Sequence, residues 1–126
     1  MKNAYISFSL FIVMIIGIFF SINMINSKCN HLQDLNSTLE SYILKGKYND
    51  AYNLSLNYIA LWKSDSKFLT LYIHHEDLDH VDNEVLKLTQ YIKIRDKSEA
   101  LATVHVMKYL IDHIKEHEKV SISNIF

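Results

Sequence analysis

The sequence predicts an all-α protein in which an N-terminal transmembrane helix precedes a small domain of four helices in two stacked hairpins. Three observations support this fold class. The run from Asn3 to Ile25 holds no Lys, Arg, Asp or Glu and is dominated by Ile, Phe, Met, Leu and Val. The chain has no Pro and only 2 Gly, so few positions favour the sharp turns that a β-protein needs. Beyond the apolar run, apolar residues recur at the three- and four-residue spacing of helices with a buried face.

The apolar run is long enough to cross a bilayer. As a helix, Ala4–Ile25 would rise about 33 Å, and a hydrocarbon core is roughly 30 Å thick. Lys2 and the free amino terminus favour the cytoplasmic side for the short leader, although Lys28 places a positive charge on the other flank. We therefore expect residues 1–27 to be a single-pass signal-anchor, and residues 28–126 to form an extracytoplasmic domain at the cell membrane.

Three other roles for the N-terminal segment fit the residues less well. A cleaved signal peptide has a shorter apolar region and a small-residue cleavage site, whereas residues 21–27 read Ser-Ile-Asn-Met-Ile-Asn-Ser. Lipidation of Cys29 requires a small neutral residue before the cysteine, and Lys28 occupies that position. A type IV pilin anchor would carry an early Glu, which the run lacks. Cys29 is the only cysteine, so it is either a free thiol or paired between chains.

Length and charge limit the partners of the remaining chain. Residues 28–126 are enough for one small domain with a single core. The formal net charge is −1, so the chain lacks the excess positive charge that would favour nucleic acid or anionic lipid as a partner. The lipid bilayer, contacted through the apolar run, is the partner that the sequence predicts directly.

The first hairpin is predicted from two amphipathic stretches. The first stretch has apolar residues at Leu32, Leu35, Leu39, Tyr42 and Ile43, and Gly46 offers a C-terminal stop. The second stretch has one face made by Tyr48, Ala51, Tyr52, Ser55, Ile59 and Trp62. Leu54 and Leu61 lie on another side of it, which predicts burial on more than one surface. Ser64-Asp65-Ser66 is the predicted break and cap after this helix.

The second hairpin follows the same logic. Its first helix is predicted from a long series of positions, namely Leu71, His74, Leu78, Val81, Val85, Leu88 and Ile92. Its second helix is predicted to begin at Asp96, with Glu99 completing a capping box, and to bury Ala100, Val104, Met107, Ile111 and Ile114. The tail from Val120 to Phe126 is expected to be extended.

An internal echo relates the two halves. Tyr42-Ile43 followed by Ala51 corresponds to Tyr91-Ile92 followed by Ala100, with the same offset for each pair. A helical hairpin cannot bury its own apolar face and becomes stable when it packs on a second one. The echo therefore supports two stacked hairpins, although its period exceeds the roughly 34 residues of a tetratricopeptide unit.

The densest group of chemically capable side chains lies between His74 and Glu84. One hypothesis is that His75 and Asp79 meet His113 or His117 across the bundle and bind a divalent metal. His113 and His117 are one turn apart, a spacing that lets two imidazoles reach one ion. The competing interpretation is an intrahelical His–Asp pair on a solvated acidic face, which is favoured because no tight signature such as H-E-x-x-H is present.

Other histidines and the aromatic residues receive structural interpretations. His74 and His105 are expected to be hydrogen-bonded core residues. The His-rich stretch could also sense acid, since imidazoles beside carboxylates titrate near neutrality. Most of the 8 Tyr and 6 Phe are explained by core burial, with predicted helix contacts at Tyr42, Tyr58, Trp62, Tyr72 and Tyr91. Only aromatic residues left exposed in a structure would indicate an interface.

Catalytic motifs are absent from the sequence. There is no serine-nucleophile, P-loop or dinucleotide-binding motif, and two glycines cannot build a phosphate-cradling loop in the soluble part. The sequence therefore predicts a protein that is not an enzyme and has no cofactor.

Several short segments carry a resemblance to a known family. They are the N-terminal anchor, Trp62, His75–Asp79, Tyr91-Ile92, Asp96–Leu101, His113-Ile114 and the closing Ser121–Phe126. Together they resemble the uncharacterised bacterial family called domain of unknown function 4363, found in spore-forming Firmicutes. The resemblance implies a small membrane-anchored helical protein, associated with sporulation and often encoded beside a multi-pass membrane protein of the YetF-like type. It implies no enzyme activity. The residues that match the family pattern are His75, Asp77, Asp79, His113 and Asn124, and the resemblance assigns a role to none of them.

These observations lead to one main expectation and one alternative. The main expectation is a membrane-anchored accessory or interaction protein that partners another membrane protein. The alternative is a metal-binding protein that uses His75, Asp79, His113 and His117.

Overall fold

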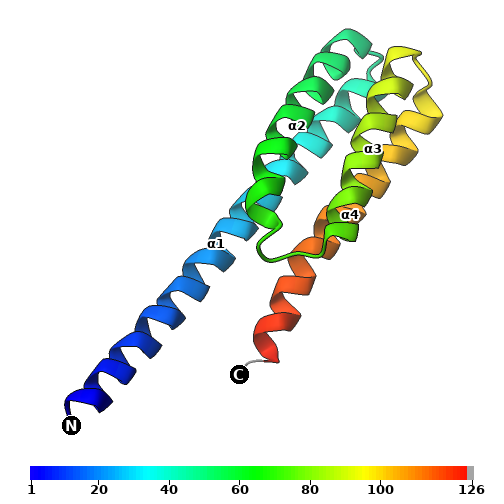
Figure 1. Cartoon of the computed structure of the whole chain (residues 1–126). Helices are drawn as coiled ribbons and strands as arrows, with labels where there is room; N and C mark the ends of the chain where they lie inside the picture. The colour runs from blue at the N-terminus through cyan, green and yellow to red at the C-terminus, as the bar shows by residue number, and fades with distance from the viewer. Residues whose placement is uncertain (125–126) are drawn as a thin grey trace.

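The computed structural model describes residues 1–124, except the side chains of residues 120–123. It contains four α-helices, which are α1 (Lys2–Leu44), α2 (Tyr48–Leu69), α3 (His75–Lys93) and α4 (Lys97–Ser123). Within the described residues there is no β-strand, so the predicted all-α class is confirmed. Figure 1 shows the helices side by side in an antiparallel bundle from which the N-terminal part of α1 projects.

Helix α1 runs without interruption for 43 residues and joins two segments that the sequence predicted separately. Among the described residues, no other helix covers its first half, and most of the large apolar side chains between Met1 and Met24 are exposed. From Ile25 onwards, one residue in every three or four is buried in the bundle, at Ile25, Cys29, Leu32, Asn36, Leu39 and Ile43. Near Ile25 the helix therefore changes from an exposed apolar segment to an amphipathic segment that packs in the bundle.

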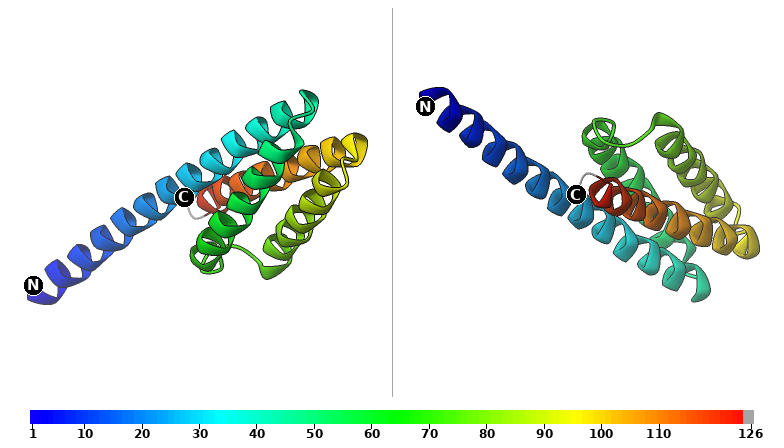
Figure 2. Two further views of the ribbon diagram at one scale, coloured as in Figure 1. Left: turned by 90° about the horizontal axis from the view of Figure 1, so that it is seen from above. Right: turned by 90° about the horizontal axis from the view of Figure 1, so that it is seen from below.

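The bundle is a ring of four helices with the two predicted hairpins as neighbours. Helices α1 and α3 each pack against both α2 and α4. The views in Figure 2 show the α1–α2 hairpin beside the α3–α4 hairpin. The largest fully buried side chains are Trp62 and Tyr58, both within α2. Leu54 and Leu61 are half-buried against the core, so α2 packs on two sides, as its sequence predicted.

The two hairpin turns have the same backbone geometry. In the first, the N–H of Lys47 donates to the carbonyl of Tyr42 at 2.8 Å, and in the second the N–H of Asp96 donates to the carbonyl of Tyr91 at 2.9 Å. Gly46 and Arg95 occupy the left-handed region, with φ of 72° and 59°. This pattern is the Schellman motif, which satisfies the free carbonyls at a helix end. The sequence echo therefore corresponds to the same turn motif at the end of α1 and at the end of α3.

This repeat gives a test of the turn geometry. Gly46→Ala is expected to lower the free energy of unfolding by roughly 1–2 kcal/mol, because a residue with a Cβ is strained at positive φ. An added Cβ meets no atom within 4 Å at Gly46, so the cost comes from the backbone alone. Thermal unfolding of the full chain in detergent, followed by circular dichroism, measures the change.

Arg95→Ala is the matched control for that change. Arg95 already bears a Cβ at positive φ, so the variant loses mainly the contact of the guanidinium with the Tyr48 ring, 5.8 Å from its centroid. Such a contact contributes about 0.5–1 kcal/mol at an exposed site. Equal losses in the two variants would show that the glycine has no special role in the first turn.

Helix α2 extends past the break that the sequence predicted at Ser64-Asp65-Ser66. Asp65 is buried and its carboxylate pairs with the Lys28 ammonium of α1 at 2.5 Å. The Ser66 hydroxyl donates back to the carbonyl of Lys63 within the same helix. These polar side chains are therefore satisfied inside the helix instead of capping its end, and the predicted break is wrong.

The connection between α2 and α3 covers residues 70–74. The sequence prediction placed Leu71 and His74 on the buried face of a helix, but α3 begins only at His75. Leu71 is 74% exposed, and His74 is an exposed residue with extended backbone at the N-cap of α3. The prediction that His74 is a core residue is therefore wrong.

Helix α4 begins as predicted and ends later than predicted. The Asp96 carboxylate accepts a hydrogen bond from the Glu99 backbone N–H at 3.1 Å, which confirms Asp96 as the cap. The helix continues to Ser123, so the expected extended tail is wrong for residues 120–123. Asn124 lies in a turn, and residues 125 and 126 lie outside the described part of the chain.

Candidate functional site between helices α2 and α3

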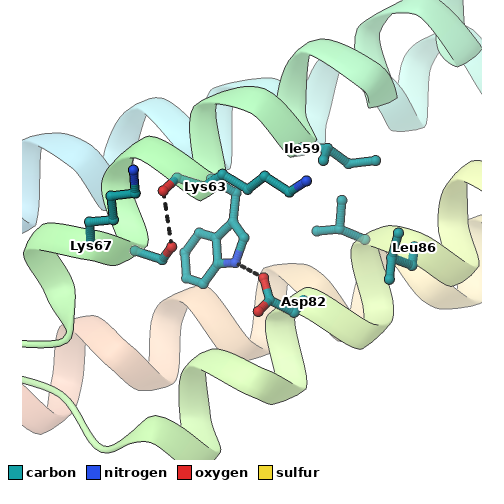
Figure 3. A pocket seen from close by; sticks show the side chains of 8 residues that line it. Ile59, Lys63, Lys67, Asp82 and Leu86 are labelled. Carbon is teal, nitrogen blue, oxygen red and sulfur yellow. Dashed lines mark hydrogen bonds between the residues drawn. The ribbon is translucent and has the colours of Figure 1, made fainter.

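A groove of about 470 Å³ lies between α2 and α3 on the outside of the bundle. Figure 3 shows its lining from both helices. The lining residues are Ile59, Trp62, Lys63, Ser66, Lys67, Asp82, Val85 and Leu86. It is therefore an open, mainly apolar groove with a few polar groups.

Trp62 and Asp82 form the polar contact at the centre of this groove. The indole is 1% exposed, and its Nε1–H donates to the Asp82 carboxylate at 2.5 Å. A buried indole N–H needs such a partner, because an unpaired buried donor is costly. The contact also fixes α2 against α3. Sequence reasoning identified Trp62 as a packed residue but did not connect it with Asp82.

The rim of the groove combines cations with exposed apolar side chains. Lys63 and Lys67 are exposed along α2, and Figure 3 shows their ammonium groups at the edge of the groove. Leu86 of α3, which lines the groove, is 56% exposed. Leu56 does not line the groove but lies one turn before Ile59 on α2, and it is 43% exposed. The indole engages the Asp82 carboxylate, so the groove is a mainly apolar surface with the ammonium groups of Lys63 and Lys67 at its edge.

The four residues of the metal hypothesis come from two neighbouring helices, α3 and α4. His75 and Asp79 are exposed on α3, and Asp79 lies one turn before Asp82, which faces α2. His113 and His117 are on α4, where their rings are 4.4 Å apart between centroids, as the one-turn spacing predicted. In the part of the chain that the structure describes, no group of three or more His, Cys, Asp or Glu side chains is arranged to hold a metal. The metal alternative is therefore not favoured.

His117 has other neighbours at the end of the bundle from which α1 projects. A small pocket of about 120 Å³ is lined by Tyr72, Ile73, His74, Asp77, His117 and Glu118. Burial raises the pKa of Glu118 above its usual value, and the nearby His117 opposes this rise. His74 and Asp77 thus share a pocket with His117, whereas His75 does not line it.

His105 lies on the side of α4 that contacts α1. Its Nε2 is 3.0 Å from the Glu40 carboxylate, and Lys108 binds the same carboxylate. Hydrogen bonds from Lys108 and His105 lower the pKa of Glu40. The predicted hydrogen bond of His105 is present, but its side chain is 62% exposed, so its placement in the core is wrong.

The comparison with protein families decides which family this chain belongs to. A family model described as domain of unknown function (DUF4363) matches residues 19–125. The chain belongs to this family. The match includes the end of the apolar run and all four helices of the bundle, from Ile25 to Ser123, in the DUF4363 chain. Neither the search of curated proteins nor that of solved structures found a match.

The residues that carried the family resemblance do not form one site in the DUF4363 fold. His75 and Asp79 are exposed on α3, while Asp77 is half-buried at the small pocket with His117. His113 stacks against Tyr109 on α4, with 6.1 Å between ring centroids, and Asn124 is exposed after the end of that helix.

Cys29 is a free thiol in the bundle core. It is 0% exposed, and burial raises its pKa to about 11. Its position leaves no path to a disulfide with a second chain while the bundle is folded, and attachment of lipid would require it to leave the core. The structure therefore favours the free-thiol interpretation among those that the sequence left open.

The thiol provides a probe of bundle integrity. The native DUF4363 chain is expected to resist a maleimide reagent, because a pKa rise from 9.0 to about 11 reduces the thiolate fraction about 100-fold, and burial blocks access as well. Labelling in urea should be complete. Rapid labelling of the folded chain, detected by mass spectrometry, would contradict the packing of α1 in the bundle.

Proposed function

We propose that the DUF4363 chain is a non-enzymatic, single-pass membrane protein whose extracytoplasmic bundle acts as an accessory or interaction subunit for another membrane protein. The observation that supports the membrane anchor is the abrupt change along α1. Large apolar side chains are exposed up to Met24, and burial in the bundle begins at Ile25.

Lipid is the environment that suits the uncovered half of α1. Leaving a large apolar side chain in water instead of burying it costs about 1.5–3 kcal/mol, and α1 exposes many of them in succession. The helix is long and apolar enough to span a membrane. Lys2 and the amino terminus favour the cytoplasmic side, so the bundle would stand on the opposite side.

The groove between α2 and α3 is the proposed contact surface. Its apolar lining, the exposed Leu86 and Leu56, and the adjacent Lys63 and Lys67 suit an amphipathic segment of a partner that carries acidic residues. Since the anchor holds the bundle at the bilayer, a partner in the same membrane is concentrated beside it. A multi-pass membrane protein of the YetF-like type is the partner that we propose.

Site-specific crosslinking in intact membranes tests the partner role. A photoreactive amino acid in place of Leu86, at the groove, should give a discrete adduct that mass spectrometry identifies as a multi-pass membrane protein. The same probe in place of Thr38, exposed on α1, should give no such adduct and serves as the control. If neither position, nor a third probe at Leu56, gives a protein adduct, the groove is not a partner surface.

A further inference from the structure

We propose that the connection between α2 and α3, residues 70–74, is a second membrane contact, in which Leu71 and Tyr72 enter the interfacial layer of the bilayer that α1 spans. The inference rests on the proposed membrane span of α1. It adds a surface of the bundle that binds lipid directly and fixes how the bundle stands on the membrane.

The depth of the α2–α3 connection in the bilayer follows from the hydrogen bond between Tyr72 and α1. The Tyr72 hydroxyl lies 3.0 Å from the Ser21 hydroxyl. Ser21 is inside the charge-free run from Asn3 to Ile25. A hydrocarbon core needs about 20 helical residues, so a span that starts near Ala4 ends two or three residues beyond Ser21. Tyr72 is therefore held at the edge of the hydrocarbon layer.

The side chains of the connection suit this position. Leu71 is 74% exposed and Tyr72 is 45% exposed, so the bundle itself leaves both largely uncovered. The Tyr72 ring packs against the ring of the half-buried Phe68, with 5.3 Å between the ring centroids. This contact restrains the orientation of the Tyr72 side chain. Tyrosine is enriched at membrane interfaces because its ring is apolar and its hydroxyl is polar.

Lipid is the occupant that the surroundings favour. The Tyr72 hydroxyl is bonded to the same helix that exposes Phe19 and Phe20 just before Ser21, so the apolar surface continues from the span to the connection. Charges at this end are mixed, since Lys67 is exposed on α2 and Glu118 lines the adjacent pocket. Insertion should therefore depend on the apolar side chains and proceed in zwitterionic lipid.

Two contacts with the bilayer, α1 and this connection, would orient the groove. Trp62 lies about two turns before the end of α2 at Leu69, which corresponds to a rise of about 10 Å. The groove would then open just above the headgroups. A juxtamembrane segment of another membrane protein could reach it there.

Depth-dependent fluorescence quenching tests the contact. Single cysteines are introduced as Leu71→Cys, Ile94→Cys and Phe11→Cys in the full chain and labelled with an environment-sensitive fluorophore. The unmodified chain, in which Cys29 is buried, controls for background labelling. The labelled chains are reconstituted in phosphatidylcholine vesicles that carry a nitroxide quencher either at the headgroup or deep in the acyl chain.

Ile94 is the matched control for Leu71. Both are exposed apolar residues outside the helices, 70% and 74% exposed, but Ile94 lies at the hairpin-turn end of the bundle. We expect strong quenching at Leu71 by the shallow quencher, several-fold less at Ile94, and strong quenching at Phe11 by the deep quencher. Quenching at Phe11 with equally weak quenching at Leu71 and Ile94 would overturn the membrane contact while leaving the anchor intact. Absence of quenching at Phe11 would overturn the anchor itself.

Discussion

Replacing Trp62 by alanine is expected to lower the free energy of unfolding by about 3–5 kcal/mol. The indole is among the largest buried side chains, and its removal leaves a cavity between α2 and α3. The Asp82 carboxylate also loses the indole N–H as a partner. Since small domains have total stabilities of about 5–15 kcal/mol, the variant should melt many degrees lower. Circular dichroism of the full chain in detergent measures the shift without relying on tryptophan fluorescence.

Two milder variants separate packing from hydrogen bonding at this position. Trp62→Phe keeps a ring in the core and removes the N–H donor, whereas Asp82→Asn keeps an acceptor and removes the charge. Each is expected to cost about 1–2 kcal/mol, which is well below the alanine variant. A loss under 1 kcal/mol for Trp62→Ala would show that the indole does not hold α2 against α3.

Removing the ammonium of Lys28 is expected to have the second largest effect, with a loss of about 2–4 kcal/mol for Lys28→Met. The Asp65 carboxylate is buried, with its side chain 6% exposed, and Lys28 is its ion-pair partner at 2.5 Å. Without that partner, α2 must carry an unpaired buried charge against α1. Urea unfolding of the full chain in detergent, monitored by fluorescence, gives the change in stability.

A double variant makes this prediction specific to the ion pair. Lys28→Met combined with Asp65→Leu removes both charges and should recover most of the lost stability, because an apolar pair can replace a buried ion pair. Asp65→Leu alone should cost less than Lys28→Met, since the Lys28 side chain is 25% exposed and its ammonium can reach water. Additive losses in the double variant would contradict a direct coupling between the two residues.

The sequence predicted the elements whose causes are local. Apolar spacing located the cores of the bundle helices, and the echo at Tyr42 and Tyr91 corresponds to two turns with the same hydrogen bonds. The break placed at Ser64-Asp65-Ser66 was wrong because Asp65 is satisfied by Lys28, 37 residues earlier. In the sequence alone, an Asp that caps a helix end cannot be told from an Asp that is buried within a helix until its ion-pair partner is known.

The candidate site was less accessible to sequence reasoning. The His and Asp residues after His74 attracted attention by their chemistry, yet His75 and Asp79 are exposed, and among the described residues they form no group of metal ligands with His113. The Trp62–Asp82 contact joins residues 20 positions apart on two helices, and its only sequence signal was an indole that needed an acceptor. Leu71 fits the apolar spacing of α3 by coincidence. Periodicity therefore could not predict that it is exposed in the connection between α2 and α3.

The most direct test of the central claim is the topology of the full-length chain in intact cells. A membrane-impermeant maleimide should label Ile94→Cys from outside, and should label Asn3→Cys, which leaves the charge of Lys2 in place, only after the membrane is permeabilised. Both chains should stay in the membrane pellet after alkaline carbonate extraction. An uncleaved chain that is recovered in the soluble fraction, or that shows equal labelling at both positions in intact cells, would contradict a bundle held outside the cytoplasm by α1.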